Sequence, residues 1–254
     1  MARDMNTRTT TLDTLSRKII LAPINGITSR PRKVWKGKSR SGWKNGGPNW
    51  LKPARKAKNN EVTDLNEQKA ILRKEIRTVL QKIPPAMRLS ASAQIRTRLK
   101  DQPFWRDAGS VLFFAPMPDE VDVWPLLEET LAGGKIIALP RFDSVSNDYL
   151  ACRVQNPQNE IGPGQYGIRE PVAGCPEIPL ERLALILIPG VAFDPQGHRL
   201  GRGRGYYDRL LPEIPGIKCG VAFDEQMVPQ VPADRHDMRM DFILTPTQCV
   251  RCEM

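Results

Sequence analysis

Short apolar runs alternate with helical patterns along most of this chain, and this alternation constrains the fold more than any other feature. The clearest strand candidates are residues 111–115, 136–139 and 183–188, and an apolar helical pattern at residues 124–131 lies between the first two. Further strand candidates are residues 149–154, 218–223 and 241–244. Alternating strands and helices build βαβ units with parallel strands. We therefore predict an α/β fold, a three-layer domain in which helices flank a largely parallel sheet.

Two helical patterns precede the first of these strands. Asp64, with Glu67 three residues further on, has the spacing of a helix N-cap. Apolar residues then recur at helical spacing up to Pro84 and Pro85, namely Leu65, Leu72, Ile76, Val79 and Ile83. A second helix is expected to follow, with Met87, Ile95 and Leu99 on one face. We expect one catalytic domain, residues 61–254, to follow an extension formed by residues 1–60.

The positive charge of the chain is concentrated in that extension. The formal net charge is +10, and residues 1–60 hold 15 Lys and Arg against two acidic residues. The remaining residues hold 23 Lys and Arg against 26 Asp and Glu, so the predicted domain is mildly acidic. The basic balance therefore describes the extension and does not indicate what the domain binds.

Residues 30–60 are rich in Lys, Arg, Gly, Ser and Asn and show no helical or strand period. Such a composition cannot bury enough apolar surface to fold, so we expect a disordered basic tail. An organelle-targeting segment and a start codon assigned too far upstream are alternatives. A nucleic-acid-binding tail is another, because Trp35, Trp43 and Trp50 could stack on bases between the basic residues.

The composition gives no sign of a membrane or of an oxidising compartment. The longest apolar run, residues 183–188, is far shorter than the roughly 20 residues of a membrane-spanning helix. Five cysteines without a secretory signal indicate reduced thiols and a cytoplasmic location. Cys249 and Cys252 have the spacing of a metal finger, but no second Cys or His pair stands nearby to complete four ligands.

The most informative segment follows the strand candidate at residues 183–188, because ligands of open α/β sheets bind beyond the carboxyl ends of strands. Glycines at alternate positions free the backbone to point N–H groups at an anion, and these are Gly201, Gly203 and Gly205. Arginines between and before them add forked donors that match phosphate or carboxylate, namely Arg199, Arg202 and Arg204. A helix that begins near Tyr206 would add its positive end, and Asp208 could hold Mg²⁺ beside a phosphate. The segment matches neither the Walker loop nor the dinucleotide fingerprint.

Residues 197–209 read Gly-x-Arg-Leu-Gly-x-Gly-x-Gly-Tyr-Tyr-Asp-Arg, and this run resembles the signature of the 5-formyltetrahydrofolate cyclo-ligase family. Other motifs of that family occur in the same order, namely Lys69-Ala70-Ile71-Leu72-Arg73, Asp119-Glu120, Tyr166-Gly167-Ile168-x-Glu170-Pro171, Gln226, Pro232, His236-Asp237 and Thr245. The resemblance covers residues 66–247 and leaves the tail unexplained.

The resemblance implies an enzyme that uses Mg-ATP to convert 5-formyltetrahydrofolate, with or without a polyglutamate chain, to 5,10-methenyltetrahydrofolate. ADP and phosphate are released, and a phosphorylated formyl group is the expected intermediate. Catalysis would then consist mostly of positioning and charge stabilisation. We expect a monomer that binds no membrane, and nucleic acid only through the tail if at all.

The resemblance also implies roles for individual residues. ATP would contact Lys69, Arg73, Arg199, Leu200, Gly201, Arg202, Gly203, Arg204, Gly205, Tyr206 and Tyr207. The folate would contact Ala115, Glu120, Tyr166, Arg202, Gly203, Arg204, Gly205 and Tyr206, with Glu120 on the pterin ring. Catalysis would fall to Arg202, Arg204 and Tyr206, and Mg²⁺ to Asp208 and Asp237.

Plainer interpretations stand beside these roles. Lys69 and Arg73 could form a solvated basic face, the tyrosines could pack in a core, and Glu120 could cap the helix that starts at Trp124. We assign no role to Asp194 and His198, since a turn explains both. Two other functions stay open: an enzyme for phosphorylated sugars or acyl-CoA that uses no ATP, against which Lys69 and Arg73 argue, and a nucleic-acid-binding protein.

Overall fold

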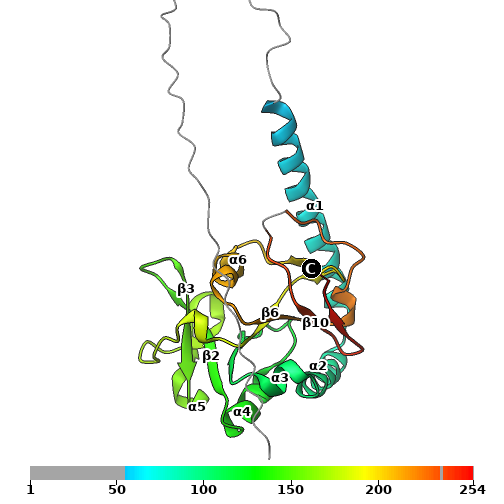
Figure 1. The fold of residues 1–254 in the computed structure, drawn as a ribbon. Coiled ribbons are helices and arrows are strands. Elements are labelled where there is room, and N and C mark those ends of the chain that lie inside the picture. Colours follow the sequence, from blue (N-terminus) through cyan, green and yellow to red (C-terminus); the bar gives the residue numbers. More distant parts are fainter. Residues whose placement is uncertain (1–54, 235–236, 254) are drawn as a thin grey trace, which may run out of the picture. The chain divides into compact units, whose positions relative to one another are not determined.

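A seven-stranded sheet, in the order β11-β10-β9-β6-β1-β2-β3, forms the centre of the computed structural model, which describes residues 55–234 and 237–253 (Figure 1). Of residues 55–63 and Tyr166 it describes the backbone alone. Five strands are mutually parallel, namely β1 (Ser110–Leu112), β2 (Ile136–Asp143), β6 (Leu185–Pro189), β9 (Ile217–Val221) and β10 (Phe242–Leu244). Two antiparallel strands form the edges, β3 (Asp148–Val154) and β11 (Cys249–Arg251). The predicted α/β fold with a largely parallel sheet is confirmed.

Successive residues of the central strands alternate between two buried cores, one on each face of the sheet. In β6, Leu185 and Leu187 pack in one core, whereas Ile186 and Ile188 pack in the other. In β1, Val111 and Leu112 divide in the same way. Burial on both faces explains why these strands read as continuous apolar runs in the sequence.

Four helices cover the first face: α1 (Arg55–Gln81), α2 (Pro85–Lys100), α3 (Pro103–Asp107) and α4 (Trp124–Ala132). They contribute buried apolar side chains such as Ile76, Ile95, Trp105 and Leu126 to that core. The second face is covered by α6 (Tyr206–Leu210), by the 3₁₀ turn η4 (Leu211–Glu213) and by irregular segments (Figure 1). The helical cover is therefore much thinner on the second face, where the glycine-rich loop precedes α6.

Short elements complete the described chain. A hairpin of β4 (Ile161–Pro163) and β5 (Arg169–Pro171) stands apart from the main sheet, as does a hairpin of β7 (Ala192–Phe193) and β8 (Arg199–Leu200). The other elements are α5 (Pro157–Glu160), η2 (Gln165–Gly167), η3 (Leu180–Arg182) and η5 (Asp224–Gln226). The two hairpins matter because both supply residues to the cavity described below.

The predicted N-cap at Asp64 is wrong. Helix α1 begins at Arg55, and the Asp64 carboxylate accepts a hydrogen bond from Gln68 Nε2 one turn further on, at 2.8 Å. Residues 55–58 are Arg, Lys, Ala and Lys, which are good helix formers and extend the helix backwards. Residue 61, the predicted start of the domain, therefore falls within α1. For residues 55–60 the predicted disorder is wrong, because they form the first turns of α1, whereas the rest of the predicted tail, with its three tryptophans, lies outside the described residues.

Two predictions of apolar faces also need correction. In α1 the buried positions are Ile76 and Leu80, four residues apart, and Val79 is 39% exposed. In α2, Ile95 and Leu99 are buried as predicted, but Met87 is 61% exposed. Both errors have the same cause. Only the side of each helix that faces the sheet is buried, and Val79 and Met87 lie beside that buried stripe.

Candidate active site

The order of the strands in the sheet reverses at β1, and a crevice forms at this point. Helix α4 leads from β1 to β2 on one side, whereas β6, β9 and β10 lie on the other. Open α/β sheets bind ligands at such a point, beyond the carboxyl ends of the strands. A cavity of about 250 Å³ lies there, lined by Phe114 and Ala115 after β1, Pro140 of β2, and Pro189 and Gly190 at the end of β6.

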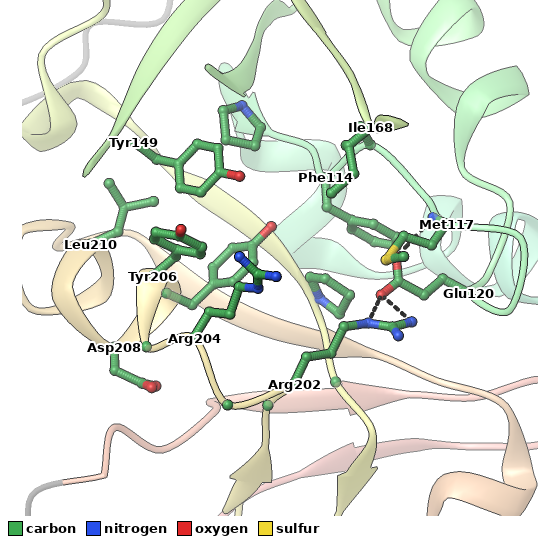
Figure 2. Close-up of a pocket in the computed structure, with 18 of the residues that line it drawn as sticks. Phe114, Met117, Glu120, Tyr149, Ile168, Arg202, Arg204, Tyr206, Asp208 and Leu210 are labelled. Carbon is green, nitrogen blue, oxygen red and sulfur yellow. Dashed lines mark hydrogen bonds and ion pairs between the residues drawn. The ribbon is translucent and has the colours of Figure 1, made fainter. Parts of the chain in front are cut away.

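The glycine-rich loop between β8 and α6 forms one wall of this cavity. Gly203 and Gly205 have φ angles of 95° and 69°, which other residues rarely adopt, so these two glycines are required by the backbone. Gly205 directly precedes α6, which begins at Tyr206 as predicted. In Figure 2, Arg204 and Arg202 extend from this loop in different directions, Arg204 towards Tyr206 and Arg202 towards Glu120.

Arg202 is held by two carboxylates from the segment after β1. It donates to Glu120 Oε1 at 3.0 Å and to Asp119 Oδ1 at 2.7 Å. Glu120 Oε2 accepts from the Met117 N–H at 3.0 Å, so both oxygens of this buried side chain have partners. Burial raises the pKa of Glu120, and the charge of Arg202 opposes that rise. Glu120 does not cap α4, because it is Asp122 that accepts from the Trp124 N–H.

Arg199 connects the start of the loop to α6. Its guanidinium donates to Asp208 Oδ1 at 2.7 Å and lies 5.5 Å from the centre of the Tyr207 ring. Burial raises the pKa of the Tyr207 hydroxyl well above its ordinary value, so this side chain stays neutral at physiological pH. Tyr206 lies in an aromatic cluster, with its ring centre 4.7 Å from that of Tyr149.

Helix α1 brings two basic residues to the outer side of the same loop. Arg73 Nε donates to the Gly201 carbonyl at 2.9 Å, and Lys69 Nζ forms an ion pair with Asp237 at 2.8 Å. Burial alone would raise the pKa of Asp237, but hydrogen bonds from Lys69 and from the Asp234 N–H, together with the charges of Lys69 and Arg199, lower it below its ordinary value. Both basic side chains are thus partly buried and paired, and they do not form a solvated basic face.

The structure brings most of the predicted site residues together at this cavity. Those that line it are Ala115, Glu120, Arg199, Gly201, Arg202, Gly203, Arg204, Gly205, Tyr206, Tyr207 and Asp208. Arg73 lines a second hollow that also reaches Arg202, whereas Lys69 and Asp237 line neither. Leu200 is buried in the core and is 1% exposed, so its side chain does not face the cavity. The side chain of Tyr166 lies outside the described part of the chain.

Asp194 and His198 form the turn that the sequence predicted. The fully buried Asp194 carboxylate accepts hydrogen bonds from three backbone N–H groups and contacts His198 Nδ1 at 3.0 Å. It therefore shapes the connection between β7 and β8, and neither side chain lines the cavity.

Several lining residues were not predicted as site residues, namely Phe114, Met117, Pro140, Tyr149, Ile168, Glu170, Pro189, Gly190 and Leu210. Phe114 and Gly190 follow strands β1 and β6, and Pro189 ends β6, so the strand pattern of the sequence indicated their place. Tyr149, Ile168 and Glu170 come from β3 and the β4–β5 hairpin, whose position over the crevice depends on tertiary contacts.

The described residues, 64–234 and 237–253, contain no group of three or more His, Cys, Asp or Glu side chains placed to hold a metal ion. Across the same residues, no helix combines the length and apolarity needed to cross a membrane.

Comparison with known proteins places this architecture in a family. The model of the 5-formyltetrahydrofolate cyclo-ligase family matches residues 65–246. The chain is 30% identical over 196 residues to 5-formyltetrahydrofolate cyclo-ligase of Mus musculus, covering 71% of this chain and 94% of that protein. It is 32% identical over 177 residues to 5-formyltetrahydrofolate cyclo-ligase of Escherichia coli, strain K12, covering 68% and 97%.

A solved structure agrees with these sequence matches. The NMR structure of 5,10-methenyltetrahydrofolate synthetase from Aquifex aeolicus has a TM-score of 0.67 and 35% sequence identity, covering 73% of this chain and 93% of that one. The family model spans most of the described residues, and the relatives match over nearly their whole length. This chain therefore belongs to the 5-formyltetrahydrofolate cyclo-ligase family.

Proposed function

We propose that this protein converts 5-formyltetrahydrofolate to 5,10-methenyltetrahydrofolate with ATP and releases ADP and phosphate. The single observation that carries the proposal is the form of the cavity: an apolar and aromatic chamber at the switch point of the sheet, closed on one side by the glycine loop with Arg202 and Arg204 and by Arg199 of β8. An apolar chamber suits a flat ring, and the arginines suit phosphates.

The folate ring is proposed to lie in the apolar part of the cavity. Phe114, Ala115 and Met117 line it from the segment after β1, and Tyr206 and Tyr149 line it from α6 and β3 (Figure 2). Tyr166 stays a predicted folate contact on the strength of the family motif alone.

The phosphates of ATP are proposed to lie against the loop and α1. Arg73 contacts the loop directly through the Gly201 carbonyl, so a phosphate held by the loop would be within reach of this helix. Lys69 lies one turn earlier on the same stripe of α1. An enzyme that used the loop only for a substrate phosphate would have no need of this second set of cations.

Two carboxylates fit a magnesium ion bound mainly by phosphate oxygens. Asp208 lines the cavity, its side chain is 52% exposed, and among the described residues its carboxylate pairs with Arg199 alone. Asp237 pairs with Lys69. Both predicted metal ligands are therefore paired with predicted phosphate-binding cations, and Mg-ATP would supply each member of a pair with a new partner. Mg²⁺ prefers one or two carboxylates plus phosphate oxygens and would neutralise phosphate charge.

The proposed chemistry has two steps. The formyl oxygen attacks the γ-phosphorus, the bond from that phosphorus to its bridging oxygen breaks, and ADP leaves. The folate N10 then attacks the formyl carbon and loses its proton, while the bond from that carbon to the phosphorylated oxygen breaks and phosphate leaves. Arg202 and Arg204 would stabilise the charge that develops on the transferred group.

A heavy-oxygen label in the formyl group tests this sequence of bonds. The proposal expects the label in the released phosphate, since the formyl oxygen leaves bonded to phosphorus. Label that appears in water and not in the released phosphate would contradict the phosphorylated intermediate. The division at residue 61, the monomeric state and the cytoplasmic location stay predictions.

A further inference from the structure

Glu170 is a buried acidic residue in the wall of the cavity, and no predicted role accounts for it. The residue lies in β5, is 7% exposed and lines the cavity. Its Oε2 accepts a hydrogen bond from the Phe142 N–H at 3.1 Å. Its Oε1 is buried and has no hydrogen-bond partner among the described residues. Buried acceptors without a donor are costly and rare, so we infer that a bound molecule donates a hydrogen bond to Oε1.

The fold makes room for this side chain at the expense of a neighbour. A Cβ at Gly164 would lie 2.5 Å from Glu170 Cγ and Cδ and 2.7 Å from its Cβ. Gly164 is itself fixed, because its N–H donates to the Ile168 carbonyl at 2.7 Å across the β4–β5 hairpin. The Glu170 side chain thus packs directly onto a backbone without a side chain, which holds the carboxylate in one place.

The other two carboxylates that line the cavity in the described chain are already engaged. Both oxygens of Glu120 have partners in Arg202 and the Met117 N–H. Asp208 is half exposed and pairs with Arg199. Among the carboxylates of the described residues, only that of Glu170 combines burial with an unpartnered oxygen at this cavity.

The surroundings indicate the kind of donor that Glu170 would accept. Apolar and aromatic side chains line this part of the cavity. Ile168, two residues before Glu170, lies on one side of the cavity, and Tyr149 lies on the other (Figure 2). A ligand here must be flat and largely apolar, yet carry N–H donors on one edge. The pterin ring has such an edge, formed by its exocyclic amino group and the adjacent ring N–H.

We propose that Glu170 binds the donor edge of the pterin ring and so positions the folate, a role first assigned to Glu120. This inference rests on the proposed function for the identity of the ring. Glu120 then serves to hold Arg202 in place for the phosphate, so that Glu170 and Glu120 serve different substrates.

The test measures binding of two ligands to the full chain without ATP. One is 5-formyltetrahydrofolate, and the other is its analogue with a methyl group in place of the exocyclic amino group. The wild-type chain should bind the analogue about 10- to 100-fold more weakly, as expected when a hydrogen bond to a charged group is lost. Glu170→Gln should weaken binding of 5-formyltetrahydrofolate about tenfold or more and should reduce the discrimination to within about threefold.

A matched control makes the same chemical change outside the cavity. Glu177 is 60% exposed and contacts Arg141 at 3.8 Å, so Glu177→Gln should keep both the affinity and the discrimination. Gly164→Ala should mimic Glu170→Gln, because the added methyl group displaces the carboxylate without removing it.

Two results would overturn the inference. One is equal binding of the two ligands by the wild-type chain, which needs no variant. The other is a Glu170→Gln variant that keeps the wild-type discrimination, whatever its affinity, because a purely structural role would weaken both ligands alike. Methenyl formation by the wild-type chain, measured in parallel, reports the proposed function separately. A chain that discriminates between the ligands but makes no product would retain this inference and lose the proposed reaction.

Discussion

Replacing Arg202 by methionine would show how much the ion pair between Arg202 and Glu120 contributes to the free energy of unfolding. Arg202 contacts Glu120 at 3.0 Å, and the Glu120 side chain is only 9% exposed. Removing one partner of a fully buried ion pair costs about 3–5 kcal/mol. Because the Arg202 side chain is 31% exposed, water screens part of this interaction. We therefore expect Arg202→Met to lower the free energy of unfolding by about 2 kcal/mol near pH 8.

The loss should depend on pH in a defined direction. Burial raises the pKa of Glu120 above its ordinary value of 4.5, and Arg202 is the first opposing influence. Without Arg202 this pKa rises further, so the folded variant keeps a proton that the unfolded chain releases. Its free energy of unfolding therefore falls as the pH rises from about 4.5 through the folded pKa. The loss relative to the wild type should be about 1 kcal/mol smaller near pH 5 than near pH 8.

Urea unfolding of the full chain, followed by tryptophan fluorescence at both pH values, measures these quantities. The double variant Arg202→Met with Glu120→Gln should recover most of the lost stability, because the amide needs no counter-charge. An equal loss at both pH values, without recovery in the double variant, would refute the reasoning.

Three further predictions concern the loop and its turn. Arg204→Ala should lower kcat about 100-fold and change the KM for ATP less than about threefold in steady-state assays, because its donors act where charge develops; a change confined to KM would contradict this. Asp208→Asn should raise the Mg²⁺ concentration for half-maximal activity about tenfold in a magnesium titration, whereas Asp148→Asn, which alters a carboxylate paired with Arg209, should not. Asp194→Ala should lower the free energy of unfolding by about 3 kcal/mol, since three backbone N–H groups lose their acceptor; a loss below about 1 kcal/mol would count against that structural role.

The sequence was most informative where local pattern and burial coincide. The run at residues 183–188 predicted β6 to within two residues, because a strand covered on both faces must be apolar throughout. The glycine and arginine spacing predicted the loop, because glycine permits the positive φ angles that Gly203 and Gly205 adopt. The helix expected to begin near Tyr206 is α6.

The remainder depends on contacts between distant parts of the chain. Arg202 and Glu120 are 82 residues apart, and nothing local indicates that one holds the other. Glu170 belongs to a motif of the family, but the sequence does not indicate that its Oε1 is buried without a partner, because this depends on the tertiary position of β5. Strand β11 was missed because Cys249–Arg251 is short and at the edge of the sheet, where pairing with β10 and not apolar pattern creates the strand.

The absorbance of the methenyl product tests the central claim most directly. The purified full chain is incubated with 5-formyltetrahydrofolate and Mg²⁺, with and without ATP, and the near-ultraviolet absorbance is followed. The account predicts that the methenyl chromophore grows only with ATP and that ADP accumulates in equal amount. No chromophore under either condition, or growth that does not need ATP, would contradict it.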